Sequence, residues 1–170
     1  MKNMSNAEDI LNFWFYEVDR DKWFADEESV DNLLREKFFG DYEKAVRGDY
    51  KTWEETPEGA LALLLLIDEF PRHMFRNTPR AYEKAGEALR LAREAIVKHF
   101  DDRIDRHYKL LFYLPFLNSE NEGDQRLSLY YIRERVKDAE WLVRAEKNFE
   151  TIQRHGRFPD RDAILGRTVD

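Results

Sequence analysis

The sequence predicts an all-α protein, and three observations support this prediction. Apolar residues recur at helical spacing almost everywhere, whereas no segment shows the alternation that is typical of a strand. Threonine precedes proline at Thr56–Pro57 and at Thr78–Pro79. This pair is typical of helix starts, because threonine caps the first turn and proline is accepted at the first helical position, where an N–H needs no partner within the helix. No residue from Gly59 to Ile67 is polar or charged, so this helix should be buried on every side.

About seven helices are expected, stacked as antiparallel hairpins around a central buried helix near residues 59–68. The other helices are expected near residues 7–17, 27–47, 80–99, 105–115, 123–137 and 138–155. The central run is too short to span a bilayer, which takes about 20 apolar residues. At 170 residues, the chain is long enough for a hydrophobic core and is expected to form a single domain, 1–170.

Pro71 is expected to end the central helix, because proline disfavours the α conformation of the residue before it. Asp68 and Glu69 would then lie in the last helical turn. The helix dipole disfavours carboxylates there by about 0.3–1 kcal/mol each. We expect the guanidinium groups of Arg72 and Arg76, just beyond, to offset this cost.

Composition excludes several classes of function. The chain has no cysteine, which excludes disulfides, thiolate zinc sites and cysteine nucleophiles. Its formal net charge of −7 argues against a nucleic-acid partner. The first residues, MKNMSNAEDI, lack the apolar region of a signal peptide, and no transmembrane segment follows, so a cytoplasmic protein without a membrane partner is expected.

Three motifs resemble those of a known family. They are IDEFPRHMFRNTPRAY at Ile67–Tyr82, FYLPFLNSENEGDQ at Phe112–Gln125 and GRFPDRDAILGR at Gly156–Arg167. With these three motifs in this order, the sequence resembles the uncharacterised family catalogued as domain of unknown function 924. The resemblance covers nearly the whole chain. The resemblance implies an all-α fold similar to the tetratricopeptide-like helical superfamily, and it implies no assigned biochemistry.

Eight residues of these motifs match the family pattern, whereas four positions of the chain depart from it. The matching positions are Arg72, Arg76, Glu120, Gln125, Arg157, Pro159, Arg161 and Arg167. Glu69 stands where the family has glutamine, and His73 stands where it has asparagine. Asn118 and Asn148 stand where the family has histidines. If the family uses those histidines for catalysis or metal binding, this chain lacks that use.

Arginines beside two Phe-Pro corners are the leading candidates for a binding site. They are Arg72, Arg76 and Arg80 beside the first corner, Phe70-Pro71, and Arg157 and Arg161 beside the second, Phe158-Pro159. Guanidinium groups bind carboxylates and phosphates through a planar fork, so two such corners together would form an anion-binding pocket. In the alternative, which we favour, the arginines pair with Asp68, Glu69, Glu120 and Asp160 and lock the corners. The two interpretations are compatible, because a locked corner can leave one fork free.

The two Phe-Pro corners are expected to lie together in space. The tail after the last helix is rich in arginine and short of apolar residues, so it would fray unless it docked on the rest of the protein. The acidic docking surface that we expect is formed by Asp68 and Glu69. Docking would set Arg157 or Arg161 against these carboxylates.

Other chemistry has less support in the sequence. Glu69 and His73 are four residues apart, as metal ligands on one helix face are, but Pro71 lies between them and no second histidine is near. A surface or capping role is therefore predicted for His73, and no metal or cofactor is expected. The acidic run from Glu120 to Asp124 suits a solvated helix start. No residue can be assigned as catalytic.

Together with the resemblance, these observations predict a binding or interaction module that uses the tetratricopeptide-like fold. The alternative is an enzyme or sensor for a small phosphate- or carboxylate-bearing ligand, and whether the protein is an enzyme stays open. The expected partner is a protein, a second copy of this chain included, or a small anionic ligand. The candidate binding residues are Arg72, Arg76, Arg157, Arg161, Glu69, Glu120 and Gln125. The early aromatic residues Phe13, Trp14, Phe15, Trp23 and Phe24 are expected mostly in the core but leave an exposed partner patch open.

Overall fold

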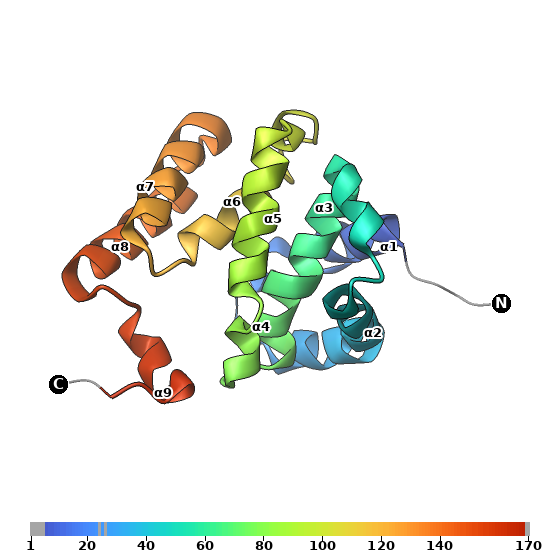
Figure 1. The fold of residues 1–170 in the computed structure, drawn as a ribbon, viewed down its shortest axis with the longest axis horizontal. Helices are drawn as coiled ribbons and strands as arrows, with labels where there is room; N and C mark the ends of the chain where they lie inside the picture. The colour runs from blue at the N-terminus through green and yellow to red at the C-terminus, as the bar shows by residue number, and fades with distance from the viewer. Residues whose placement is uncertain (1–5, 24, 26, 169–170) are drawn as a thin grey trace. The chain divides into compact units, whose positions relative to one another are not determined.

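The computed structural model describes residues 6–23, 25 and 27–168, and every regular element within them is helical (Figure 1). The predicted all-α class is therefore confirmed. The contacts between residues divide the chain into two compact units, Met1–Arg103 and Ile104–Asp170. The single domain expected from the sequence stays a prediction. Within the described residues, no helix combines the length and the apolar character that crossing a membrane requires.

The amino-terminal unit is built around α3. Its α-helices are α1 (Ala7–Asn12), α2 (Glu28–Arg47), α3 (Pro57–Leu64), α4 (Phe70–Met74) and α5 (Ala85–Val97). Helix α3 packs against α1 and α5, and α4 packs against α2. The predicted central helix is thus the centre of this unit, and Leu64 in its middle is only 3% exposed.

The start of α3 follows the predicted pattern. The backbone N–H of Gly59 donates to the side-chain oxygen of Thr56 at 3.0 Å, so Thr56 caps the helix as expected. A β-carbon at position 59 would lie 2.2 Å from the carbonyl oxygen of Trp53. Only glycine therefore allows the 3₁₀ turn at Lys51–Glu55 to pack this closely against α3.

Pro71 does not end the central helix, so that prediction is wrong. A π turn at Leu65–Glu69 joins α3 directly to α4, and the N–H of Phe70 donates to the carbonyl of Leu65. This wider turn shifts the hydrogen-bond register by one residue just ahead of Pro71, which accommodates the missing N–H and the ring of the proline. Asp68 and Glu69 consequently lie in the middle of a continuous helix and are buried.

Three of the early aromatic residues belong to the core. Phe13, Trp14 and Trp23 are all buried. The rings of Trp14 and Trp23 stack with centroids 5.9 Å apart, and the indole N–H of Trp23 donates to the carbonyl of Trp14 at 3.1 Å. Phe15 is half-buried, and Phe24 lies outside the described residues.

The carboxyl-terminal unit contains α6 (Leu110–Leu117), α7 (Glu122–Tyr131), α8 (Ala139–His155) and α9 (Asp162–Leu165). Helix α7 packs against both α6 and α8. The side chain of Asp138 caps α8, and Gly156 ends it in the left-handed conformation at φ 72°. Helices commonly end at a residue in the left-handed conformation, most often glycine. Here Gly156 turns the chain into the tail that holds the second Phe-Pro corner.

Candidate functional site

The predicted arginine site begins with Arg76, whose guanidinium is held by its own chain. Its Nε and one Nη donate to the two carboxylate oxygens of Asp31 on α2, each at 2.8 Å. The same Nη also donates to the carbonyl of Ala25 at 3.1 Å. Burial raises the pKa of Asp31, but the hydrogen bonds and charge of Arg76 outweigh this and hold that pKa below its usual value. Arg76 therefore ties the loop before α2 to the end of α4.

His73 belongs to the same network, and the predicted surface or capping role is wrong. The imidazole is buried, with Nδ1 3.1 Å from a carboxylate oxygen of Asp31 and Nε2 2.8 Å from the carbonyl of Trp23. Because the helix continues past Pro71, His73 faces the core. Burial lowers the pKa of His73 despite these partners. The Nδ1 of the ring also lies 3.1 Å from an Nη of Arg76.

Arg72 is held less tightly. One Nη lies 3.4 Å from a carboxylate oxygen of Asp68, and the guanidinium carbon lies 5.1 Å from the centre of the Tyr82 ring. Its buried Nε has no hydrogen-bond partner among the described residues. Burial lowers the pKa of Arg72, but the charges of Asp68 and Glu69 outweigh this and raise it. Arg72 therefore lies against the buried Asp68, but the predicted cost of a carboxylate in the last helical turn does not arise because the helix continues, and Arg76 pairs with Asp31 instead.

The second Phe-Pro corner is closed by ion pairs within the carboxyl-terminal unit. Glu120 accepts two hydrogen bonds from Arg167, at 2.7 and 3.1 Å, and one from the N–H of Phe158 at 2.6 Å. Asp162 accepts from Arg167 at 2.9 Å and from the Nε of Arg157 at 2.9 and 3.1 Å. Asp162, rather than the predicted Asp160, is thus the aspartate in this network.

Arg161 and Gln125 also contact their own unit. The guanidinium carbon of Arg161 lies 4.6 Å from the centre of the Phe158 ring. The side-chain amide of Gln125 donates to the carbonyls of Leu117 and Ser119 at 2.8 and 2.7 Å, which satisfies backbone groups at the end of α6. Gln125 is fully buried, and these contacts fit a structural role.

The predicted site residues thus fall into two groups. Glu69, Arg72 and Arg76 belong to the amino-terminal unit, and Glu120, Gln125, Arg157 and Arg161 belong to the carboxyl-terminal unit. Within each group, ion pairs and hydrogen bonds fit the favoured structural interpretation. The predicted docking of the second Phe-Pro corner on the first would be a contact between the two units, and it stays a prediction. Among residues 6–23, 25 and 27–168, no three His, Asp or Glu side chains gather as metal ligands.

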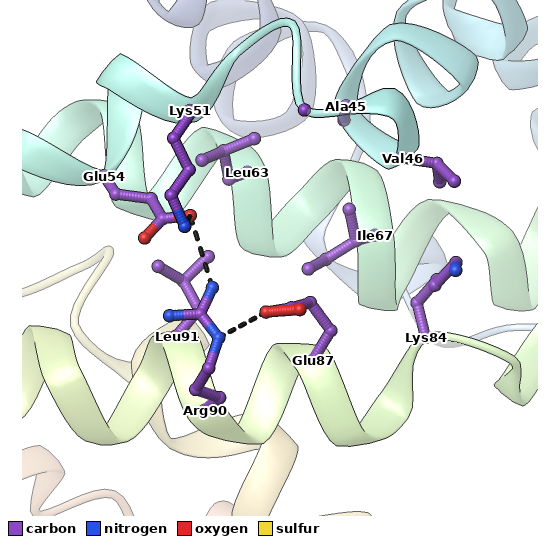
Figure 2. Close-up of a pocket in the computed structure, with 11 residues that line it drawn as sticks. Ala45, Val46, Lys51, Glu54, Leu63, Ile67, Lys84, Glu87, Arg90 and Leu91 are labelled. Atoms are coloured by element: carbon purple, nitrogen blue, oxygen red, sulfur yellow. Dashed lines mark hydrogen bonds and ion pairs between the residues drawn. The ribbon is translucent and has the colours of Figure 1, made fainter.

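A pocket of about 180 Å³, which we call the α5 pocket, lies within the amino-terminal unit (Figure 2). Its floor is apolar: Leu63 and Ile67 come from α3 and the π turn, and Leu91 comes from α5. These three side chains are 3–6% exposed. Val46, near the end of α2, adds a 40% exposed apolar side chain to the lining. The pocket therefore presents apolar surface that joins the core.

Arg90 neutralises the carboxylates around the α5 pocket. It donates to Glu94 at 2.7 Å and to Glu54 at 3.3 Å, and its Nε donates to Glu87. Figure 2 shows its guanidinium between Glu54 and Glu87. Burial lowers the pKa of Arg90, but these three hydrogen bonds outweigh burial and raise it. Arg90 therefore stays charged, with its donors directed to its own chain.

Two lysines stand at opposite ends of the α5 pocket (Figure 2). Lys51 lies 3.4 Å from a carboxylate oxygen of Glu54. Lys84, which precedes α5, makes no ion pair within the part of the chain that the structure describes, and its side chain lies on the side of Val46. Sequence reasoning missed this pocket. The spacing of Glu87, Arg90 and Glu94 was a readable signal of helix ion pairs, but their pairing with Glu54 depends on tertiary packing.

Comparison with known proteins places the chain in a family. Residues 10–169 match the family described as "Bacterial protein of unknown function (DUF924)". The chain is similar to the solved structure of a protein of unknown function from Agrobacterium tumefaciens, with 34% sequence identity and a TM-score of 0.90 over 96% of this chain and 92% of that one. The comparison with curated proteins gives no match. Since the family match covers nearly the whole sequence, this chain belongs to the DUF924 family.

Proposed function

We propose that this protein is a helical binding module and that the α5 pocket is its ligand site. The observation that carries this proposal is an apolar floor beside Lys84, a cation without an ion pair in the described chain. Ligand sites combine apolar lining with a few placed polar groups. By contrast, Arg76 and Arg157 already donate to carboxylates of their own units.

A tetratricopeptide-like stack of helical hairpins is the finer fold that we propose. The packing of α3 against α1 and α5 supports it in one unit, and the packing of α7 against α6 and α8 supports it in the other. Stacks of this kind present side chains from successive helices on one surface. The α5 pocket has this composition, because its lining comes from α2, α3 and α5 and from the turns next to them.

The pocket can be tested with probes that carry one isobutyl group. We expect 4-methylpentanoate and its neutral amide to shift the methyl resonances of Leu63, Ile67 and Leu91 in NMR spectra of the full chain. Val46→Trp should block the pocket, because Val46 is 40% exposed and a larger side chain there need not disturb the core. Val97→Trp, on a 77% exposed residue at the end of α5, is the matched control.

The two variants decide between binding and its absence. Methyl shifts that are present in wild type and Val97→Trp but lost in Val46→Trp support the proposal, provided circular dichroism shows both variants folded. Shifts that persist in Val46→Trp mean that the probe binds elsewhere. If no probe shifts the three methyl groups in the wild-type protein, the α5 pocket is not a ligand site.

A second candidate function is a sensor or enzyme that holds a small anion at Arg72. The buried Nε of Arg72 without a partner among the described residues, and its long 3.4 Å contact with Asp68, favour this candidate. Phosphate or sulfate should then raise the melting temperature, because a ligand that binds only the folded state stabilises it. The rise should disappear in Arg72→Gln and remain in Arg80→Gln. An unchanged melting temperature in the wild-type protein excludes the anion site.

A further inference from the structure

We propose that the α5 pocket receives an acidic segment of a partner polypeptide. One aliphatic side chain of that segment would enter the pocket, and a neighbouring carboxylate would pair with the ammonium group of Lys84. This inference rests on the proposed binding function of the pocket. It adds the chemical class of the partner.

The size of the pocket favours a single inserted side chain. Pockets for small-molecule ligands commonly measure about 300–1,000 Å³, whereas the α5 pocket measures about 180 Å³. An aliphatic side chain such as that of leucine fits such a space, whereas a cofactor-sized molecule does not.

The surroundings of the pocket favour a polypeptide over a free metabolite. Leu63, Ile67 and Leu91 are already 3–6% exposed, so filling the pocket alone covers little new apolar surface. A partner gains more by covering the rim as well, where Val46 is 40% exposed and the side chain of Lys51 is 71% exposed. A polypeptide can reach the rim residues at the same time as the floor, because its flanking residues continue beyond the inserted side chain.

The charges around the pocket favour an acidic segment. The carboxylates of Glu54, Glu87 and Glu94 all accept hydrogen bonds from Arg90, so its positive charge already offsets part of theirs and weakens their attraction for an incoming cation. An incoming carboxylate displaces nothing at Lys84. The whole chain carries a formal charge of −7, so attraction to an acidic partner must come from the local rim and should weaken as salt rises.

Short synthetic peptides with blocked ends test this inference on the full-length protein. In the first peptide one leucine is flanked by glutamates; the second has glutamines in place of the glutamates; the third has alanine in place of the leucine. Binding is followed by the methyl resonances of Leu63, Ile67 and Leu91, and 4-methylpentanoate is titrated in parallel. We expect the alanine peptide to bind about tenfold more weakly than the first, or worse, because it loses the buried side chain.

A double-mutant cycle isolates the ion pair of Lys84. Lys84→Gln should weaken binding of the glutamate peptide about twofold to fivefold, the size expected for a partly exposed ion pair. It should leave binding of the glutamine peptide unchanged. Lys98→Gln is the matched control, since Lys98 lies 14 residues further along the chain, at the other end of α5 and about 20 Å away. That variant should bind the glutamate peptide as the wild type does.

Each outcome has a separate meaning. Equal binding of the glutamate and glutamine peptides, or equal effects of Lys84→Gln on both, overturns the acidic partner. Saturation by 4-methylpentanoate at the same concentration as the glutamate peptide overturns the polypeptide, while the pocket remains a ligand site. If neither the peptides nor 4-methylpentanoate shift the three methyl groups, the proposed binding function fails together with this inference.

Discussion

Replacing Asp31 by asparagine should destabilise the amino-terminal unit. Asp31 is 6% exposed and accepts hydrogen bonds from both nitrogens of the Arg76 fork. Asparagine has nearly the same shape but one oxygen instead of two, so its amide nitrogen must face one of the two Arg76 donors in either orientation. The substitution therefore removes both a charge and a hydrogen bond while creating almost no cavity.

The expected loss in the free energy of unfolding depends on how exposed Arg76, the partner of Asp31, is. A hydrogen bond to a charged group contributes about 1.5–3 kcal/mol, and an unpaired buried group costs a similar amount. The side chain of Arg76 is 26% exposed, so water can replace part of what it loses. We expect Asp31→Asn to lower the free energy of unfolding by about 2 kcal/mol, which corresponds to about 4–8 °C in melting temperature for a chain of this size.

Urea unfolding followed by tryptophan fluorescence measures this loss, and its pH dependence tests the cause. The folded-state pKa of Asp31 is lowered, so the stability that its charge contributes is present above the unfolded pKa of about 3.9. That contribution is lost as the pH falls through the folded-state pKa. The difference between Asp31→Asn and wild type should therefore shrink near pH 3, after growing from about pH 7 to pH 5 because the variant lacks the carboxylate that raises the pKa of His73.

Asp21→Asn, at an exposed aspartate before α2, is the control and should change the stability by less than about 0.5 kcal/mol. A loss of that small size in Asp31→Asn at pH 7 would refute the role given to the Arg76 fork. So would a loss that stays constant down to pH 3, because it could not come from the charge.

Four further predictions concern stability. Leu64→Ala should cost about 2–5 kcal/mol in chemical denaturation, because Leu64 is 3% exposed; a loss under about 1 kcal/mol would show that the helix is not central. Because burial lowers the pKa of His73, the folded state resists its protonation, so stability should fall as the pH drops below about 6.5, the unfolded value. In His73→Asn the urea midpoint should therefore depend less on pH between about pH 7.5 and 5.5. An equal pH dependence of the midpoint in both proteins contradicts this. Deleting residues 156–170 removes Arg157, Asp162 and Arg167 and should lower the melting temperature, so an unchanged value would show that the tail is dispensable. Adding EDTA should leave the helical circular dichroism unchanged, and a loss of signal would reveal a structural metal.

The sequence predicted those parts of the fold that depend on local patterns. The apolar run from Gly59 to Ile67 identified the helix at the centre of the amino-terminal unit, and Thr56 identified its start. Both signals are local, because capping involves residues three apart and an all-apolar surface requires burial whatever the neighbours are. The predicted helix near residues 27–47 corresponds to α2 at Glu28–Arg47, because apolar residues recur at helical spacing along it, which is also a local signal.

The candidate site could be predicted only in part. The arginines pair with carboxylates in both units, as the favoured interpretation expected, but the aspartates that pair with Arg76 and Arg157 are Asp31 and Asp162. Asp31 lies 45 positions away from Arg76 in the sequence, and the packing of α2 on α4 determines which carboxylate is in reach. The α5 pocket was missed for the same reason, because tertiary packing brings its lining together from α2, α3 and α5.

The π turn at Leu65–Glu69 links the wrong prediction at Pro71 to both candidate sites. A helix that ended at Pro71 would leave His73 and Arg76 in a surface loop, whereas the continued helix carries His73 into the core and Arg76 to Asp31. The same turn supplies Ile67 to the floor of the α5 pocket and Asp68 to Arg72. π turns occur often at functional sites, because the extra residue redirects side chains without breaking the helix. The π turn in the central helix therefore contributes side chains both to a buried ion-pair network and to the lining of the α5 pocket.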